Sequence, residues 1–182
     1  MKYKMIVLDL DGTLTNNKKL ITPHTQQALM LAQTAGVHVV LASGRPTYGI
    51  VPLAEELKLK ENNGYILAFN GGKIIDCTNN NVLFEQKLDE QLVPLLYQEA
   101  KKANMEILTY QGEGIAATNK DDKYVQHEAF INKMPVMQYD DFLHQLVYPI
   151  NKCLIVGDPT PLHELELRLS KELEGRMDVY RS

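Results

Sequence analysis

Three short apolar runs, at residues 5–10, 37–42 and 65–69, are separated by longer stretches of mixed apolar and polar residues. The runs are continuous rather than alternating, which is typical of strands buried on both faces of a parallel sheet. The stretches between them, residues 22–35 and 46–59, carry apolar residues at helical spacing. The pattern therefore predicts strand, helix, strand, helix, strand, which is the order of a parallel sheet with helical crossovers.

The residues at the ends of the first predicted helix agree with its boundaries. Thr22 can cap the helix, Pro23 suits its first position, and Gly36 suits the residue after its end. Pro52 falls inside the second predicted helix, where we expect it to lie in the first turns or to kink the helix. Together these residues favour an α/β fold for this part of the chain.

The pattern changes after Gly72, and the rest of the chain reads as an α+β unit. Strands are predicted at 73–76, 82–86, 105–110, 115–118 and 152–156, with a further one possible at 177–180. Helices are predicted at 89–103, 120–131 and 160–173, with a weaker one at 140–146. We therefore divide the chain into a parallel-sheet domain, residues 1–80, and an α+β domain, residues 81–182.

Polar residues gather where each of the first three predicted strands ends, at 9–13, 43–45 and 70–72. Ligands of open parallel sheets bind beyond the carboxyl ends of the strands. The predicted topology therefore brings the three clusters to one site.

Two carboxylates leave the end of the first strand, from Asp9 and Asp11. Gly12 follows them and permits a sharp turn and a close approach of the backbone to a ligand. Acids paired in this way are costly without a cation, and Mg²⁺ takes carboxylate and phosphate oxygens as ligands. The segment therefore suits a phosphorylated substrate bridged through Mg²⁺, although solvated acids at a strand end are the simpler alternative.

At these residues the sequence resembles the haloacid dehalogenase superfamily. Asp9-Leu10-Asp11-Gly12-Thr13 is similar to its first motif, and Ala42-Ser43-Gly44-Arg45 is similar to the second motif of its Cof-type (subfamily IIB) sugar phosphatases. Asn70-Gly71-Gly72 also fits that subgroup. The resemblance implies a Rossmann-like core with an inserted cap domain of the Cof (C2B) type, which closes over the site and selects the substrate.

The resemblance also implies roles for these residues. Asp9 would be the nucleophile that takes the phosphoryl group, and Asp11 the general acid and base. Asp9 through its side chain and Asp11 through its backbone carbonyl would bind Mg²⁺. Substrate phosphate would be bound by a set drawn from all three clusters: Gly12, Thr13, Ser43, Gly44, Arg45 and Asn70.

Two of these assignments have plain structural alternatives. Residues 43–46 would also suit the capped start of an ordinary helix. Arg45 could contact the substrate or could brace the loop. Asn70 lies in a turn in either interpretation.

Two motifs that the resemblance implies, a lysine and an acidic GDxxND-like segment after the cap, are not found before Ser182. Gly157-Asp158-Pro159 begins like the acidic motif, but no acid follows it at the expected places. We therefore expect an incomplete core, a cap that is also incomplete, and an exposed first strand through which copies of the chain could associate. Three functions stay open: an Mg²⁺-dependent phosphatase of sugar phosphates or similar esters, a sugar phosphomutase, and an inactive fragment that binds only phosphate or a partner.

Composition narrows the classes of partner. The chain has 182 residues and a formal net charge of -4, which argues against a nucleic-acid surface. It has no apolar run long enough to span a membrane. Cys77 and Cys153 lack the spacing of a metal site, and we expect two free, buried thiols and a cytoplasmic protein.

Overall fold

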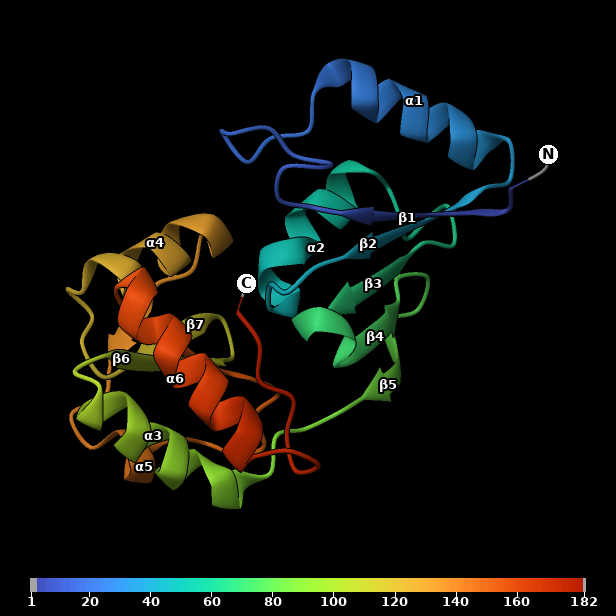
Figure 1. Cartoon of the computed structure of the whole chain (residues 1–182). Helices are drawn as coiled ribbons and strands as arrows, with labels where there is room; N and C mark the ends of the chain where they lie inside the picture. The colour runs from blue at the N-terminus through green and yellow to red at the C-terminus, as the bar shows by residue number, and fades with distance from the viewer. Residues whose placement is uncertain (1–2, 182) are drawn as a thin grey trace. The chain divides into compact units, whose positions relative to one another are not determined.

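The computed structural model of the protein describes residues 3–181, and the chain divides into two compact units, Met1–Gln86 and Lys87–Ser182. Each unit has its own sheet (Figure 1). The expected α/β fold with a parallel-sheet core is confirmed in the first unit.

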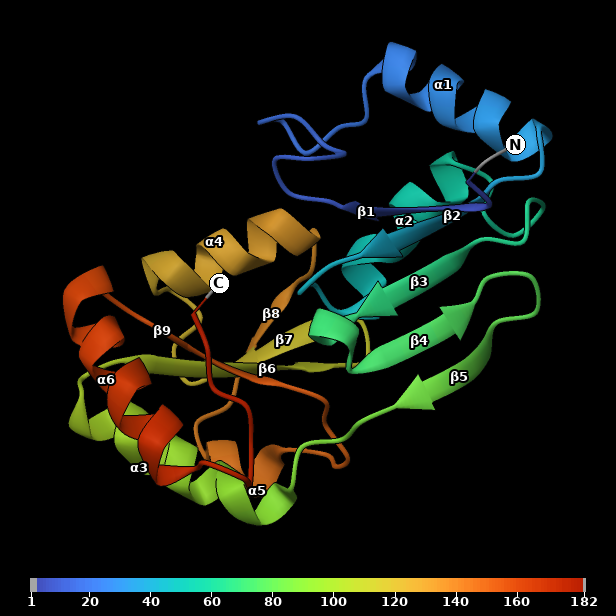
Figure 2. The same ribbon diagram turned by 45° about the vertical axis from the view of Figure 1, so that its right-hand side comes forward.

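The first unit contains one sheet in the order β1-β2-β3-β4-β5 (Figure 2). Strands β1, β2 and β3 are parallel, and β4 and β5 add to the sheet as an antiparallel hairpin. The strands are β1 (Met5–Asp9), β2 (His38–Ala42), β3 (Tyr65–Ala68), β4 (Lys73–Asp76) and β5 (Asn81–Glu85).

Two helices, α1 (Pro23–Thr34) and α2 (Thr47–Glu56), connect the parallel strands and bury one face of this sheet. Leu29 of α1 and Ile50 of α2 belong to the same buried cluster as Leu41 of β2. The predicted cap of α1 is confirmed, because the Thr22 side chain accepts a hydrogen bond from the backbone of Thr25. The two crossovers thus fix the direction in which β1, β2 and β3 end.

The other face of the first sheet is apolar, and neither described helix of the first unit, α1 or α2, covers it. Met5 and Val7 of β1 are 50% and 56% exposed. A shallow hollow of about 240 Å³ on this face is lined only by apolar or aromatic residues: Met5, Val7, Val40, Tyr65, Leu67 and Ile74. Within the described residues β1 pairs only with β2, so the expected exposed edge is present.

The division between the units lies at Gln86 and Lys87, six residues later than the boundary expected from the sequence at residues 80 and 81. The reason is β5, which pairs along its length with β4 and thereby extends the first sheet. The hairpin of β4 and β5 was predicted, and the division expected at residues 80 and 81 falls between its two strands.

The second unit is an α+β layer structure around the sheet β8-β7-β6-β9. Helices α3 and α6 share one buried cluster with α5, and α4 contributes to another. Its elements are α3 (Val93–Lys102), β6 (Glu106–Gln111), β7 (Gly114–Ala117), α4 (Lys123–Asn132), β8 (Val136–Gln138), α5 (Phe142–Gln145), β9 (Cys153–Val156) and α6 (Pro159–Glu172).

Two features of this unit differ from the prediction. The short strand β8 was missed, and it pairs in parallel with β7 through Val136 and Met137. The possible strand at 177–180 is absent: these residues form no sheet, and the Val179 carbonyl instead accepts a hydrogen bond from the Ser170 hydroxyl. Met177 and Val179 contribute to the apolar cluster without a strand partner.

Both cysteines are free, as expected; Cys77 is buried and Cys153 half-buried. Burial raises the pKa of the Cys77 thiol to about 11, with a smaller contribution from the negative charge of Asp76. Of the helices that the structure describes, none is both long and apolar enough to cross a membrane.

Candidate active site

The carboxyl ends of β1, β2 and β3 form one edge of the first sheet. Asp9 pairs in register with Ala42, and Ala42 pairs with Leu67, so the last residues of β1 and β2 lie in one row with the second-last residue of β3. The three arrowheads point to the same side in Figure 1. Neighbouring strands are about 4.8 Å apart, so the chain at Asp9 lies one strand spacing from the residue that precedes Ser43.

Asp9 is the exposed end of β1. Along this strand exposure alternates, and Asp9 lies on the same face as Met5 and Val7. Among the described residues no group donates a hydrogen bond to its carboxylate. A carboxylate in this state has both oxygens available for a ligand.

The chain turns sharply after Asp9. Gly12 has a φ of 83°, a conformation that side-chain-bearing residues rarely adopt. The backbone N–H of Leu14 donates to the Asp9 carbonyl at 3.1 Å, and the Thr15 hydroxyl donates to the Leu10 carbonyl at 2.9 Å. These bonds fix the turn that carries Asp11.

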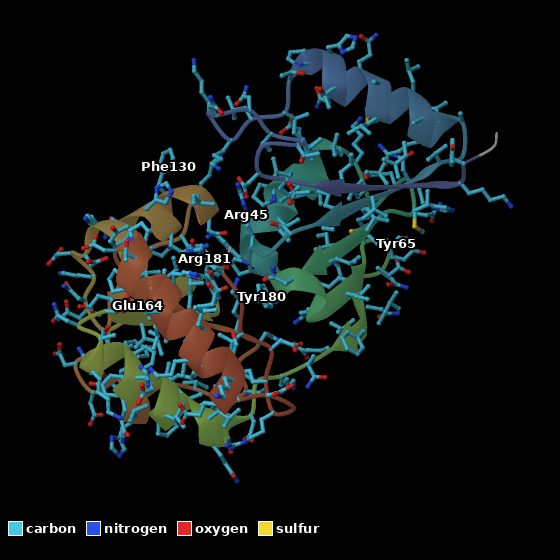
Figure 3. All side chains as sticks on the ribbon, in the orientation of Figure 1. Arg45, Tyr65, Phe130, Glu164, Tyr180 and Arg181 are labelled. Atoms are coloured by element: carbon cyan, nitrogen blue, oxygen red, sulfur yellow. The ribbon has the colours of Figure 1, made fainter. Side chains whose placement is uncertain are left out.

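Asp11, by contrast, is enclosed by two cations. The Arg45 guanidinium binds it with two hydrogen bonds, from Nε to Oδ2 at 2.8 Å and from Nη2 to Oδ1 at 2.6 Å. The Lys19 ammonium donates to the same Oδ1 at 2.7 Å. Figure 3 labels Arg45, which lies where the chain leaves β2 and enters α2.

The charge state of Asp11 follows from these contacts. Burial acts to raise the pKa of its carboxyl, but the hydrogen bonds and positive charges of Arg45 and Lys19 outweigh burial and hold the pKa below its ordinary value of 3.8. Asp11 is therefore a carboxylate at neutral pH in this state. It can act as a general acid only after a contact with a cation has been replaced.

Ser43, Gly44 and Asn70 come together beside this pair. The Asn70 backbone N–H donates to the Ser43 carbonyl at 3.0 Å, and Asn70 has a φ of 58°. A Cβ on Gly44 would lie 3.1 Å from the amide atoms of Asn70. The Ser43 hydroxyl accepts a hydrogen bond from the Arg45 backbone at 3.2 Å, and its own proton can point elsewhere. A side chain at position 44 would therefore press against the Asn70 amide, so glycine suits the close approach of the second and third clusters.

The Arg45 side chain is buried and held by protein groups in this structure, so it is not free to bind a ligand. Its side chain is 7% exposed. Beyond its two bonds to Asp11, Nη1 donates to the Gly49 carbonyl at 3.3 Å. Thr13 is exposed, and its backbone N–H donates to the Leu10 carbonyl at 3.4 Å. None of the described contacts joins Thr13 to Ser43 or Asn70.

Lys19 is the one residue here that sequence reasoning missed. It lies eight positions after Asp11 in a polar stretch without a motif. The feature that could have indicated Lys19 is the connection between β1 and α1, because a loop that leaves the end of β1 and leads to α1 must pass over the site. The lysines at its tip were available to pair with the two acids.

The donor set suits Mg²⁺ only in part. The described residues contain no group of three or more His, Cys, Asp or Glu side chains that could hold a metal ion. Mg²⁺ is often held by one or two carboxylates together with substrate phosphate and water. Asp9 meets that minimal requirement, whereas the side chain of Asp11 is occupied by Arg45 and Lys19.

Comparisons with known proteins agree with this geometry. Residues 6–182 match the family of haloacid dehalogenase-like hydrolases. A crystal structure of a haloacid dehalogenase-like hydrolase from Bacteroides thetaiotaomicron is 49% identical, with a TM-score of 0.93 over 99% of this chain and 68% of that one. A sugar phosphatase of haloacid dehalogenase subclass IIB is 17% identical, with a TM-score of 0.68 over 89% of this chain and 62% of that one, a likeness of fold alone.

The relatives are longer than the chain. A curated Streptococcus pyogenes relative is 32% identical over 139 residues, which are 75% of this chain but 51% of that protein. The chain thus spans about half of this curated relative and about two thirds of the two solved structures.

Proposed function

The chain belongs to the haloacid dehalogenase-like hydrolase family, and from this premise we propose that it is a Mg²⁺-dependent phosphatase acting on sugar phosphates or similar small esters. Asp9 would attack the phosphorus and form an aspartyl phosphate, which water then hydrolyses. The proposal rests on the row of strand ends, in which Asp9 lies one strand away from Ala42, the residue before Ser43. The Asp9 carboxylate accepts no hydrogen bond among the described residues.

The two aspartates suit different roles because their surroundings differ. Asp9 is exposed and receives no hydrogen bond among the described residues, so an oxygen of its carboxylate is available to attack phosphorus. Asp11 lies two residues after Asp9, and its carboxylate contacts two cations, Lys19 and Arg45. In the proposed reaction it protonates the leaving alcohol and later takes a proton from the attacking water, once a contact with a cation has been exchanged.

The phosphate group would be held by the second and third clusters. The Ser43 hydroxyl and the backbone N–H of Gly44 supply donors, and Asn70 packs against Gly44 and fixes the loop. Donors fixed in this way stabilise the charge of a transferring phosphoryl group without rearranging during the reaction.

Mg²⁺ would be held by the Asp9 side chain and the Asp11 backbone carbonyl, with substrate oxygens and water completing the shell. When bound, the ion neutralises charge between the Asp9 carboxylate and the phosphate. The second unit is proposed as the cap that selects the substrate.

Hydrolysis of p-nitrophenyl phosphate with Mg²⁺ tests the proposal. The Asp9→Asn variant should lose at least about 100-fold in rate, because an amide cannot form the aspartyl phosphate. The exposed Asp89→Asn, which begins a short turn in the second unit, is the matched control and should keep the full rate. Equal rates for the chain and Asp9→Asn would exclude Asp9 as the nucleophile.

A second candidate is a chain that binds phosphate without turnover. It is favoured by the small acidic donor set, because the described residues contain no group of three or more His, Cys, Asp or Glu side chains that could hold a metal ion. Phosphate binding that Asp9→Asn and Ser43→Ala alter, together with rates at background for every variant, would support this candidate over the phosphatase.

A further inference from the structure

Lys19 and Arg45 both contact Asp11, but they are fixed to very different degrees. The Arg45 side chain is 7% exposed and is held by Asp11 and by the Gly49 carbonyl. The Lys19 side chain is 23% exposed, and among the described residues its ammonium has one partner, Asp11 Oδ1. An ammonium has three donors, so Lys19 retains two for another acceptor.

The backbone around Lys19 is shaped to bring its side chain back over the strand end. Asn16 organises the turn: its side chain accepts hydrogen bonds from the backbone N–H groups of Lys18 and Leu20, at 2.8 and 3.2 Å. Lys19 itself has a φ of 60°, a left-handed conformation that is uncommon for lysine. Lys19 thus lies at the tip of a loop whose base is anchored by the buried Thr15 and Ile21.

The formal charges of the four side chains at the site indicate how Lys19 could respond to a bound phosphate. Asp9 and Asp11 carry two negative charges, and Arg45 and Lys19 carry two positive ones. Before a metal ion is counted, a phosphate ester adds negative charge to a set of four side chains that is formally neutral. Arg45 is buried and held from two directions, so Lys19 is the cation that can respond.

Resting on the proposed function, we propose that Lys19 is a phosphate-binding residue, whose ammonium moves from Asp11 Oδ1 to a phosphate oxygen when substrate enters. The same movement removes one of the two hydrogen bonds that Asp11 Oδ1 accepts, while Arg45 keeps its two bonds to the carboxylate. Lys19 therefore binds Asp11 in the absence of substrate and binds the phosphate in its presence, while Arg45 stays in place.

Binding of inorganic phosphate to the purified chain, measured by titration calorimetry with and without Mg²⁺, tests this role. Lys19→Gln should weaken phosphate binding about 10-fold or more, the loss expected for one charge-assisted hydrogen bond. Lys18→Gln removes the same charge from the same turn, and its side chain contacts no acid among the described residues. This control should bind within about twofold of the unchanged chain.

Lys19→Gly separates binding from folding, because glycine adopts the left-handed conformation without strain. It should keep the melting temperature of the unchanged chain and still lose phosphate affinity. Unchanged affinity in both Lys19 variants would overturn the role of Lys19 and leave the phosphatase proposal standing. Failure of the unchanged chain to bind phosphate under either condition would instead overturn the proposed site, and the role of Lys19 with it.

Discussion

Asp9 and Asp11 are two positions apart in the sequence, yet their carboxylates have opposite surroundings. Asp9 ends a strand and faces outward, whereas Asp11 is enclosed by Arg45 and Lys19. Environment commonly divides paired carboxylates into different chemical roles in this way. The division supports one acid as the attacking group and the other as the group that handles protons.

The bidentate bond between Arg45 and Asp11 should be the main stabilising contact at this strand end. Arg45→Gln removes the two hydrogen bonds of a buried guanidinium to a carboxylate that is itself 35% exposed. We expect the free energy of unfolding to fall by roughly 1–2 kcal/mol, because solvent screens the exposed side of the Asp11 carboxylate. Urea unfolding at neutral pH measures the change.

Lys73→Gln is the matched control for that experiment. Lys73 forms a 3.1 Å ion pair with Glu85, and both side chains are about a quarter exposed. Such a pair contributes about 0–1 kcal/mol, so its loss should be barely measurable. If Arg45→Gln lowered the free energy of unfolding no more than Lys73→Gln does, Arg45 would not be the main stabilising contact at this strand end.

Most of the residues at the site could be predicted from the sequence, because they follow the ends of consecutive strands. The row of Asp9, Ala42 and Leu67 is a direct consequence of parallel pairing. The partners of Asp11 could not be predicted, because hydrogen bonds between a carboxylate and residues eight and 34 positions away depend on the path of a loop and on a rotamer. The resemblance to Cof-type phosphatases agrees with the family found, but it gave no role to Lys19.

At the scale of the elements, helices and strands with strong end signals were predicted well. The cap at Thr22 and the glycine at Gly36 define the ends of α1 as expected, and the hairpin of β6 and β7 is present. The misassignments share one cause. A short strand is defined by its hydrogen-bonding neighbour, so neither β8 nor the sheet to which β5 belongs can be read from local pattern.

A charged contact between α3 and α6 gives the second unit a pH-dependent component of stability. Glu99 is 5% exposed and accepts hydrogen bonds from Lys102, at 2.7 Å, and from Arg168. Hydrogen bonds from Lys102 and Arg168 hold the pKa of Glu99 below its ordinary value of 4.5. Glu99→Gln should therefore lower the free energy of unfolding at pH 7 by roughly 1–3 kcal/mol.

The sign of the pH dependence follows from the lowered pKa. The folded state favours the ionised form, so the contribution of Glu99 is complete above its ordinary pKa and is lost as the pH falls through its folded pKa. The difference between the chain and Glu99→Gln in urea unfolding should shrink below pH 4.5. Glu172→Gln, at an exposed position of α6, should show no such change, and an equal difference at acid and neutral pH would refute the linkage.

At the scale of the molecule, the first sheet presents an apolar face and an unpaired edge at β1 within the described residues. Exposed apolar edges of this kind pair readily with other chains. The expectation of self-association drawn from the sequence therefore stays a prediction, and the exposure of Val7 gives a way to examine it.

Light scattering over a range of concentrations should detect association of the unchanged chain. Val7→Lys places a charge on the face that would be buried and should weaken the association about 10-fold or more. Leu167→Lys adds the same charge at a 60% exposed position of α6 and should leave it unchanged. A strictly monomeric chain at every concentration would rule out this use of the β1 edge.

The most direct test of the phosphoryl-transfer role proposed for Asp9 is mass spectrometry of the chain. The chain is quenched in acid during incubation with p-nitrophenyl phosphate and Mg²⁺ and is then digested. The peptide that contains Asp9 should carry one added phosphoryl group, which Asp9→Asn abolishes and Asp11→Asn allows to accumulate. Release of p-nitrophenol by the chain with no phosphoryl group on Asp9 at any quench time would contradict the mechanism.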